Sequence, residues 1–374
     1  MDKVLNVVFG MHYGGTESFI LNTERNIQNG KLRFDYLYLK DENSPRDKEL
    51  LASGSKIHKI RNHIIFTKLN LFYSIYRVVK NNNYNIVHSH LNELNGLIML
   101  TVFFAGARKR ISHLHFPHYY EGKNLLKKYY YKLQSILIYR FSTDIFYCSE
   151  PTFESYKLPK KGIDKSHLIK NTISLDKFFQ APYRKSKYSE EFSIPAEHKI
   201  ITNITRFDHN KNQKFIVEVF LEMLQMNSEL ILLLGGEGAE KNNICNIVRK
   251  YSLTDKVRFI GVRNDVEQIL KISDLYIFPS IEEGFGIVAL EAQACRLHTV
   301  CSSNVPKSTD VGLGLASYLD LNLGSKYWAK YMIDLLNCDN PNLSEQDILN
   351  SFNTCGYNEI EQAKIVEKIY CNEN

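Results

Sequence analysis

Two carboxylates in the second half of the 374-residue chain carry the clearest chemical signal. Glu283 follows an apolar run, Asp274–Pro279, that predicts a buried strand, and Glu291 lies on the helix expected after the glycine turn 284–286. At 1.5 Å per helical residue the two carboxylates are about 12 Å apart. That separation suits two hydroxyl-bearing sugars that flank a diphosphate, and the N–H groups at the helix start favour phosphate. The alternative is that Glu291 is an exposed helix residue and that Glu283 is an acid that interacts with the helix dipole.

Two cations lie in the loop after the predicted strand Lys199–Thr205. Arg206 and Lys211 follow the carboxyl end of that strand, where open α/β sheets bind their ligands. Cations suit a diphosphate leaving group, whose developing charge must be neutralised if no metal does so. The sequence has no Asp-x-Asp motif to hold a metal. Taken alone, the pair is also consistent with solvated loop residues.

A glycine turn follows a predicted strand in each half of the chain. The turn 14–17 contains Gly15, and the turn 235–238 contains Gly236 and Gly238. Neither matches the G-x-G-x-x-G spacing of a dinucleotide fingerprint. Glycines in both turns would let the backbone approach a ligand closely. The alternative is that both turns only allow a strand to pack tightly against the following helix.

Five histidines gather at or just after strand ends in the first half, namely His88, His90, His113, His115 and His118. Alternating histidines place their side chains on one face of a strand, which is compatible with a metal ion. No nearby cysteine or acidic residue completes a ligand set, so we expect no metal and no other cofactor. We expect His88 and His113 to pack within the sheet, and His115 and His118 to face a ligand.

Charge is distributed unevenly along the chain. The formal +6 divides into +12 for residues 1–180, with 27 basic and 15 acidic side chains, and −6 for residues 181–374, with 20 and 26. Within 51–140, 14 basic side chains accompany only two acidic ones. Lys123–Phe141 mixes basic and aromatic residues at helical spacing, as helices that rest on anionic lipid headgroups do. An ordinary surface helix is the alternative, and nucleic acid is not expected because no RNA-binding motif accompanies the charge.

Short β-branched runs alternate with helical segments, which is typical of parallel sheets built from βαβ units. The predicted strands are Val4–Phe9, Phe34–Leu39, Ile86–Ser89, Arg110–His115 and Asp144–Cys148 in the first half, and Lys199–Thr205, Glu229–Leu234, Lys256–Ile260, Asp274–Pro279 and Thr299–Ser302 in the second. The predicted fold class is α/β, with two doubly wound Rossmann-like domains that face each other across a ligand cleft.

The domain boundaries are predicted from a polar stretch near the middle of the chain. Residues 181–197 are rich in lysine, serine and glutamate and are the expected linker between a first domain at 1–180 and a second at 198–345. The remaining segment, 346–374, is expected to be helical. Within it, Asn358–Tyr370 has apolar residues at helical spacing that should pack onto a domain.

The seven cysteines are scattered and form no Cys-x-x-Cys pair, which indicates a reduced chain. The amino-terminal segment lacks the pattern of a secretory signal. The longest uncharged stretch, Leu94–Ala107, is shorter than the roughly 20 residues that span a bilayer. We expect a cytoplasmic protein whose basic segment 51–140 attaches it to the anionic inner face of the cell membrane.

Together these motifs resemble glycosyltransferase family 4, whose members are retaining enzymes of the GT-B fold that use nucleotide-sugar donors. The matching positions are the turn 14–17, Arg206 with 211–212, Gly236-x-Gly238, Asp274–Ser280, and Glu283 and Glu291 with seven residues between them. The most specific run is Pro279-Ser280-x-Glu282-Glu283-Gly284-Phe285-Gly286, which leads to Glu291-Ala292. Within the family the chain looks most like bacterial capsular or exopolysaccharide transferases.

The resemblance implies a role for each position. Arg206 and Lys211 would contact the diphosphate, Glu291 the ribose hydroxyls, and Glu283 the donor sugar, with His115 near that sugar. The positions implied to pack against sugar and phosphate are Gly15, Gly236, Gly238 and the amides of Phe285, Gly286 and Ile287. Val262 and Arg263 would frame the base, and the C-terminal helix would cross back onto the first domain.

The implied activity is transfer of a hexose-type sugar from a nucleotide sugar, preferably a UDP-sugar, without a metal. The acceptor would be lipid-linked or an oligosaccharide in surface polysaccharide synthesis. A nucleotide-sugar epimerase of the same fold is one alternative, because it also clamps a nucleotide sugar between two such domains. A non-catalytic nucleotide-sugar-binding subunit is another, although it would have no need to keep Glu283, Glu291, Arg206 and Lys211.

Overall fold

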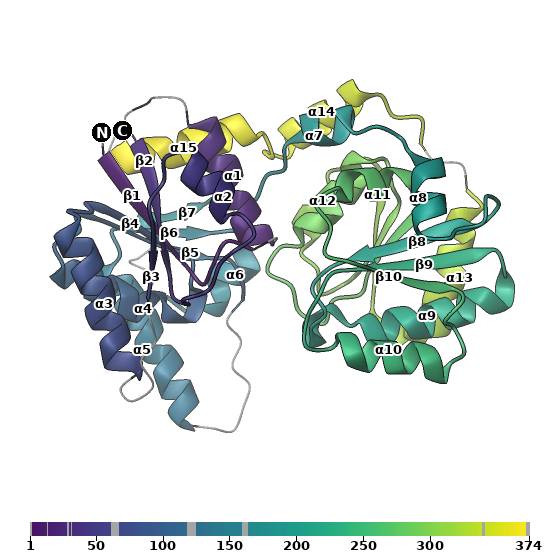
Figure 1. The fold of residues 1–374 in the computed structure, drawn as a ribbon, viewed down its shortest axis with the longest axis horizontal. Helices are drawn as coiled ribbons and strands as arrows, with labels where there is room; N and C mark the ends of the chain where they lie inside the picture. The colour runs from purple at the N-terminus through teal and green to yellow at the C-terminus, as the bar shows by residue number, and fades with distance from the viewer. Residues whose placement is uncertain are drawn as a thin grey trace. The chain divides into compact units, whose positions relative to one another are not determined.

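The computed structural model describes residues 2–371 apart from 13, 28–29, 31, 61–66, 118–124, 159–163 and 339–340. The chain divides into two units, each built on its own parallel sheet (Figure 1). The first unit comprises Met1–Thr172 and Asn358–Asn374, and the second comprises Ile173–Tyr357.

The first unit has a seven-stranded sheet in the order β3-β2-β1-β4-β5-β6-β7, and all of its neighbouring strands are parallel. Its strands are β1 Asp2–Val8, β2 Leu32–Tyr38, β3 Ile57–Lys59, β4 Ile86–Ser89, β5 Lys109–Leu114, β6 Asp144–Tyr147 and β7 Ser166–Leu168. Its helices are α1 Gly15–Asn26, α2 Asp47–Ala52, α3 Thr67–Asn81, α4 Asn95–Phe104, α5 Leu125–Phe141, α6 Glu150–Ser155 and α15 Glu359–Cys371.

Helices cover both faces of this first sheet, because successive side chains along a strand point to opposite faces. In β1, Val4 and Val8 pack with residues of α1 and α15. The alternate residues Leu5 and Val7 pack with residues of α3 and α4. Near-continuous apolar strands of this kind are expected when a parallel sheet is buried on both sides.

The second unit has a six-stranded parallel sheet in the order β10-β9-β8-β11-β12-β13. Its strands are β8 Lys199–Ile204, β9 Leu230–Gly235, β10 Val257–Gly261, β11 Leu275–Phe278, β12 Thr299–Ser302 and β13 Ala316–Leu319. Its helices are α7 Leu175–Gln180, α8 Lys185–Glu191, α9 Gln213–Met226, α10 Lys241–Lys250, α11 Val266–Ile272, α12 Ile287–Ala294, α13 Gly324–Leu336 and α14 Glu345–Thr354.

The predicted α/β class with two doubly wound units is confirmed, and every predicted strand forms within two residues of its expected start. Three strands were not predicted: β3, β7 and β13. All three lie at sheet edges and are three or four residues long. An edge strand has one neighbour and little buried surface, so its sequence lacks the apolar run that marks a central strand.

The expected linker is wrong in part, because residues 181–197 contain helix α8. Tyr188 of α8 is buried and packs with Phe192 and Ile194 in a core cluster of the second unit. The polar residues of this stretch are the outer face of an amphipathic helix, and periodicity over only seven residues is hard to recognise.

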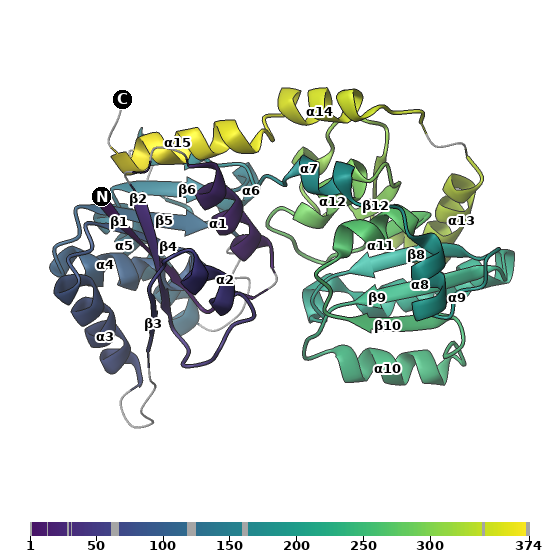
Figure 2. The same cartoon turned by 45° about the horizontal axis from the view of Figure 1, so that its top comes forward.

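The C-terminal segment is also shorter than predicted, because α14 belongs to the second unit and only the part from Asn358 onward joins the first. The predicted crossing of the last helix onto the first domain is confirmed. Helix α15 lies along α1 in both ribbon views (Figures 1 and 2). Val366 is fully buried in the first core, and Gln362 Oε1 accepts a hydrogen bond from the Lys170 N–H at 3.1 Å.

Candidate active site

The loop between β8 and α9 holds the two predicted cations in different ways. Asp208 caps a short 3-10 turn, His209–Lys211, by accepting a hydrogen bond from the Lys211 N–H at 3.2 Å. The next residue, Asn212, adopts a left-handed conformation with φ of 56° and starts α9. Arg206 Nε donates to the Asp208 carboxylate at 2.8 Å, and the Arg206 side chain is 78% exposed. The exposed guanidinium therefore remains accessible to an anion.

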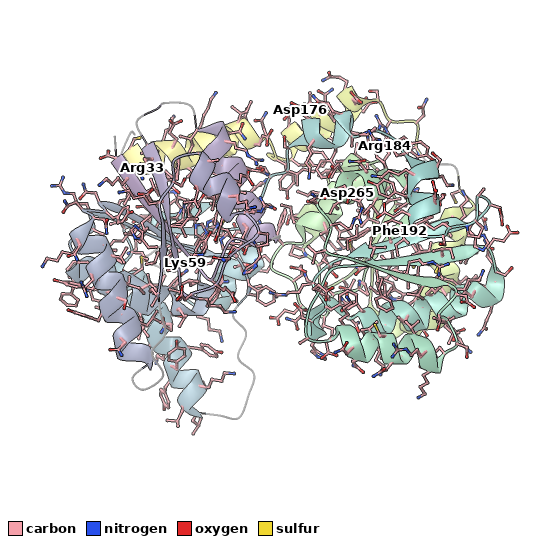
Figure 3. The ribbon with its side chains drawn as sticks, viewed as in Figure 1. Arg33, Lys59, Asp176, Arg184, Phe192 and Asp265 are labelled. Carbon is pink, nitrogen blue, oxygen red and sulfur yellow. The ribbon has the colours of Figure 1, made fainter. Side chains whose placement is uncertain are left out.

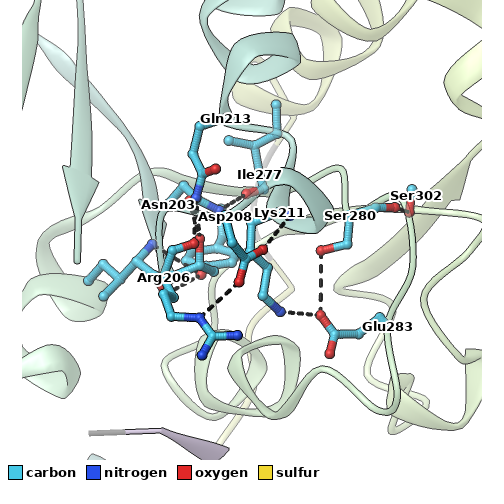
Figure 4. A network of polar contacts seen from close by, with 12 residues as sticks. Asn203, Arg206, Asp208, Lys211, Gln213, Ile277, Ser280, Glu283 and Ser302 are labelled. Atoms are coloured by element: carbon cyan, nitrogen blue, oxygen red, sulfur yellow. Dashed lines mark hydrogen bonds and ion pairs between the residues drawn. The ribbon is translucent and has the colours of Figure 1, made fainter. Parts of the chain in front are cut away.

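Lys211 contacts Glu283, so the structure brings together two residues that are 72 positions apart (Figure 4). Both side chains are largely buried, and the Lys211 ammonium also lies 5.1 Å from the centre of the Phe278 ring. Ser280 Oγ lies 3.5 Å from the same Glu283 oxygen. The result is a fixed cation–carboxylate pair beside the exposed charge of Arg206.

Gln213, the first residue of α9, holds this loop by two hydrogen bonds. Its amide nitrogen donates to Thr205 Oγ1 at 3.0 Å and to the Arg206 carbonyl at 2.9 Å. Asn203 donates to the Ile277 carbonyl at 2.8 Å and so joins β8 to β11 (Figure 4). Gln213, Asn203 and Asp208 were not predicted as site residues. Gln213 and Asn203 are buried, and a polar residue at the end of an apolar strand or at the start of a helix was the sequence signal that could have identified them.

The glycines of the turn 235–238 pack against the backbone of the Arg206 loop. A Cβ atom on Gly236, whose φ is +122°, would lie 2.1 Å from the Thr205 carbonyl oxygen. A Cβ atom on Gly238 would lie 2.1 Å from the Phe207 carbonyl oxygen. These two glycines therefore have a role in positioning Arg206, and direct contact of either with a donor stays a prediction.

The glycine turn before α12 is equally constrained. Gly286 caps the helix with φ of +91°, and a Cβ atom there would lie 2.9 Å from the Phe278 ring. The Phe285 ring is buried against Tyr357, 5.7 Å between centroids. Among the described residues, the N–H groups of Phe285 and Gly286 donate to no acceptor. Together with the N–H of Ile287, they form the helix N-terminus that the sequence predicts to bind an anion.

Glu291 lies on α12 as predicted and has an unusual environment. Burial raises the pKa of its carboxyl from 4.5 to about 7, Lys177 acts to lower it, and Glu267 adds to the rise. Lys177 itself is paired with Glu267 at 2.9 Å. The Glu291 carboxylate has no hydrogen-bond partner among the described residues, so it is free to accept hydrogen bonds from hydroxyl groups.

The Arg263 side chain makes its hydrogen bonds to residues of its own unit, the second. It donates two hydrogen bonds to Asp265, at 2.8 and 2.7 Å, and one to Glu191 of α8 at 2.8 Å. It also lies 5.5 Å from the Phe192 ring (Phe192 and Asp265 are labelled in Figure 3). These contacts fasten α8 to the sheet. Val262, the preceding residue, is 52% exposed, and its contact with a base stays a prediction.

In the first unit, four histidine rings stack along the ends of β4 and β5. His88, His90 and His113 are buried, and His115, at the end of β5, is half-buried. The His113 and His115 rings are 3.8 Å apart, and His90 Nδ1 lies 2.9 Å from His115 Nε2. Gly15 is the first residue of α1. The predicted ligand contact of His118 lies outside the described residues.

Three of these histidines, His88, His90 and His113, place ring nitrogens within 4.8 Å of one another, which is a possible ligand set for a metal. Five of their six ring nitrogens are engaged in other contacts, and His113 Nε2 has no hydrogen-bond partner among the described residues. His113 Nδ1 lies 3.2 Å from His88 Nε2, and His88 Nδ1 lies 2.6 Å from the Tyr370 hydroxyl. The His88 and His113 rings are parallel within 3°, so they do not point toward a common centre. The absence of a metal in this protein stays a prediction.

Helix α5 presents an apolar stripe to solvent. Leu126, Tyr129, Leu133 and Ile136, hereafter the α5 stripe, are between 47% and 82% exposed. The opposite face of the helix buries Gln134 and Ser135 together with Ile138. This is the reverse of an ordinary surface helix, whose apolar face is buried. Among the described helices, none is both long enough and apolar enough to cross a bilayer.

Comparison with known proteins finds a family whose model matches part of the second unit. Residues 184–311 match the family described as Glycosyl transferases group 1. The chain is 27% identical to the putative glycosyltransferase EpsF of Bacillus subtilis over 88% of this chain and 86% of the relative. It is 26% identical to the capsular polysaccharide biosynthesis glycosyltransferase CapH of Staphylococcus aureus, over 90% and 91%.

The fold is also that of a solved structure, Anabaena Alr3699/HepE in complex with UDP-glucose. The two chains superpose over their full lengths with a TM-score of 0.79 at 14% identity. The predicted resemblance to capsular and exopolysaccharide glycosyltransferases of the GT-B fold is thereby confirmed at the level of group 1. Its assignment to family 4 stays a prediction.

Proposed function

We propose that this chain, whose residues 184–311 match the group 1 glycosyltransferases, transfers a hexose-type sugar from a UDP-sugar to a lipid-linked or oligosaccharide acceptor. The proposed reaction retains the anomeric configuration and needs no metal. The observation that carries the proposal is the arrangement of Lys211, Glu283 and Arg206 beyond the carboxyl ends of β8 and β11. Close to Glu283 in sequence lie the N–H groups of Phe285 and Gly286, which have no acceptor among the described residues. HepE, whose fold this chain shares, was solved with UDP-glucose.

Each end of the second-unit site offers chemistry that matches one part of a nucleotide sugar. The free Glu291 carboxylate suits the two hydroxyls of a ribose, which donate hydrogen bonds to it. The exposed Arg206 and the Lys211 ammonium suit a diphosphate. Glu283, held in place by Lys211, suits the hydroxyls of the sugar. A contact of His115, in the first unit, with the sugar stays a prediction of the family resemblance.

In the proposed mechanism the bond between the anomeric carbon and the donor phosphate oxygen breaks, and a bond from the acceptor oxygen forms on the same face. The acceptor hydroxyl gives its proton to the departing phosphate. Arg206 and Lys211 stabilise the negative charge that develops on the leaving diphosphate. That neutralisation by side chains is why no metal is required.

The test is a panel of nucleotide sugars assayed by nucleotide release, with and without EDTA, for wild type and Glu291→Ala. The exposed residue Glu229 provides a matched control, Glu229→Gln. We expect one UDP-sugar to react in EDTA, with retention at the anomeric carbon of the product. Glu291→Ala should raise the donor KM strongly, and the control should behave as wild type. Loss of activity in EDTA, or an unchanged donor KM in Glu291→Ala, contradicts the mechanism.

The same assay separates the epimerase alternative. An epimerase would convert the sugar of the nucleotide sugar without any acceptor, and no free nucleotide would be released. Proton NMR of the reaction mixture without acceptor distinguishes the two activities directly. A protein that binds nucleotide sugars and catalyses neither reaction would instead be a binding subunit.

We also propose that the α5 stripe contacts an anionic membrane surface that carries the acceptor. The exposed apolar residues alternate along the helix with exposed lysines such as Lys128 and Lys132. Apolar groups insert among acyl chains while basic groups attract anionic headgroups, so the two kinds of residue favour the same surface. An acceptor anchored in that surface would be presented to the first unit.

Flotation with vesicles tests this contact. Wild type should float with vesicles that contain phosphatidylglycerol, much less with phosphatidylcholine alone, and less at high salt. The double substitution Leu126→Gln and Leu133→Gln should reduce flotation several-fold. Leu51→Gln, at an exposed leucine of α2, is the control and should have no effect. Binding that ignores both lipid charge and the α5 stripe contradicts the proposal.

A further inference from the structure

A chain of hydrogen bonds runs through the interior of the first unit and ends at His115. His115 Nε2 lies 2.9 Å from His90 Nδ1, and His90 Nε2 lies 3.2 Å from Asn6 Oδ1. The Asn6 amide nitrogen then donates to Glu24 Oε1 at 2.9 Å. This chain of hydrogen bonds joins helix α1, strand β1, the end of β4 and the end of β5.

Both histidines of this chain are neutral. Burial lowers the pKa of His115 to about 3 and lowers that of His90 well below its usual value. A neutral imidazole has one N–H donor and one nitrogen that only accepts. Each hydrogen bond in the chain therefore determines the direction of the next.

The direction in the structure leaves the outer nitrogen of His115 without a proton. The Asn6 oxygen can only accept, so His90 Nε2 carries the hydrogen and His90 Nδ1 accepts from His115 Nε2. His115 Nδ1 is then a bare acceptor. Among the described residues this nitrogen has no partner, and His115 as a residue is half-buried.

We propose that Glu24, Asn6 and His90 are positioning residues that decide which ring nitrogen of His115 carries the proton. The proposal deepens the proposed function and rests on it for its effect on catalysis. With Glu24 ionised, the Asn6 amide nitrogen must point to the carboxylate, and the chain runs as described. With Glu24 protonated, the acid donates to the Asn6 oxygen, every bond of the chain reverses, and His115 carries its proton on Nδ1.

Glu24 is placed to respond to pH near neutrality. The Tyr36 hydroxyl donates to it at 2.6 Å, and burial raises the pKa of the Glu24 carboxyl to about 8. The other titratable or charged groups that face it are Arg25 on α1, Asp35 on β2, His88 on β4, His90 after β4 and Tyr370 on α15. Of these, Arg25 favours the ionised carboxylate and Asp35 opposes it.

The position of the proton matters because glycosyl transfer passes through a state with positive charge on the sugar ring. A bare His115 Nδ1 presents the negative end of the imidazole dipole to that charge, whereas an N–H presents the positive end. We therefore expect kcat to rise with pH as Glu24 ionises, separately from any effect of Glu291 on donor KM.

The decisive measurement is the tautomer of His115 by long-range proton–nitrogen NMR on protein labelled with ¹⁵N-histidine. The His115 signals are assigned by their loss in His115→Gln. At pH 9.5, where Glu24 is ionised, wild type should carry the proton on Nε2. Glu24→Gln should carry it on Nδ1, because the oxygen of the introduced amide accepts from Tyr36 and its nitrogen donates to Asn6. The same tautomer in both proteins overturns the proposal.

Asn6→Leu tests the path, since leucine has a similar shape and no polar group. In this background, Glu24→Gln should no longer alter the His115 tautomer, and a change that persists overturns the proposed route. If Asn6→Leu does not fold, the His115 tautomers of wild type and Glu24→Gln still show whether Glu24 controls the position of the proton. In kinetics, Glu24→Gln should lower kcat about 3- to 10-fold at pH 9.5 with the donor KM unchanged.

The NMR measurement of the His115 tautomer requires no nucleotide-sugar donor. It can therefore be made even if the protein turns over no nucleotide sugar. A protein without transferase activity whose His115 tautomer follows Glu24 would contradict the proposed function alone. A protein with activity whose tautomer ignores Glu24 would contradict this inference alone.

Discussion

The Tyr370 hydroxyl in the C-terminal helix and Nδ1 of His88 in β4 form a buried hydrogen bond of 2.6 Å between residues 282 positions apart. It connects the end of the chain to the centre of the first sheet. The first unit is therefore complete only when the last helix has returned to it.

Tyr370→Phe should destabilise the first unit by about 1–3 kcal/mol, because it leaves a buried His88 nitrogen without a partner. Urea unfolding followed by circular dichroism measures the change. Tyr327→Phe, at a half-exposed tyrosine of α13 in the second unit, is the matched control and should have little effect. Equal stability of Tyr370→Phe and wild type would show that the bond does not hold the helix.

Lys211→Met should lower kcat by about 10²–10³-fold, since it removes a cation proposed to stabilise the leaving diphosphate. Lys214→Met is the matched control, because Lys214 lies three residues away and its side chain is 64% exposed. Nucleotide release under saturating donor measures both. A similar kcat for the two variants would argue against a role of Lys211 in the reaction.

Donor affinity should increase about tenfold from pH 6 to pH 8, as Glu291, with its pKa raised to about 7, becomes ionised and accepts the ribose hydroxyls. Calorimetric titration with the UDP-sugar measures it, and Glu291→Gln should give a flat profile. Stability has the opposite sign. Because the folded pKa lies above the unfolded value of 4.5, the contribution of this group to stability is lost as pH rises through 7. Glu291→Gln should thus be more stable than wild type at pH 8.

Gly236→Ala should displace the Arg206 loop, because the new Cβ atom would clash with the Thr205 carbonyl and φ is +122°. We expect a loss of about 1–3 kcal/mol in unfolding free energy together with weaker binding of UDP. Gly314→Ala controls for backbone strain alone, since its φ is +71° and nothing lies within 4 Å of the new atom. Unchanged UDP affinity in Gly236→Ala would separate the glycine turn from the site.

Local sequence was enough to predict the central strands and the positions of Glu283 and Glu291. Leu230–Leu234 and, apart from Asn6, Val4–Val8 are apolar and buried on both faces of a sheet, so their apolar runs are easy to recognise. Glu283 and Glu291 follow one such strand directly. Their placement in a turn and on the next helix depends only on neighbours in sequence, as does the glycine turn between them.

Contacts between residues that are distant in sequence were determined only by the tertiary structure. The contact between Lys211 and Glu283, the commitment of Arg263 to Asp265 and Glu191, and the chain from Glu24 to His115 join separate elements. Helix α5 exposes Leu126 and Leu133 and buries Gln134, Ser135 and Ile138. A local pattern specifies which elements form, whereas the pairing of side chains depends on which sheet edges and helix faces meet.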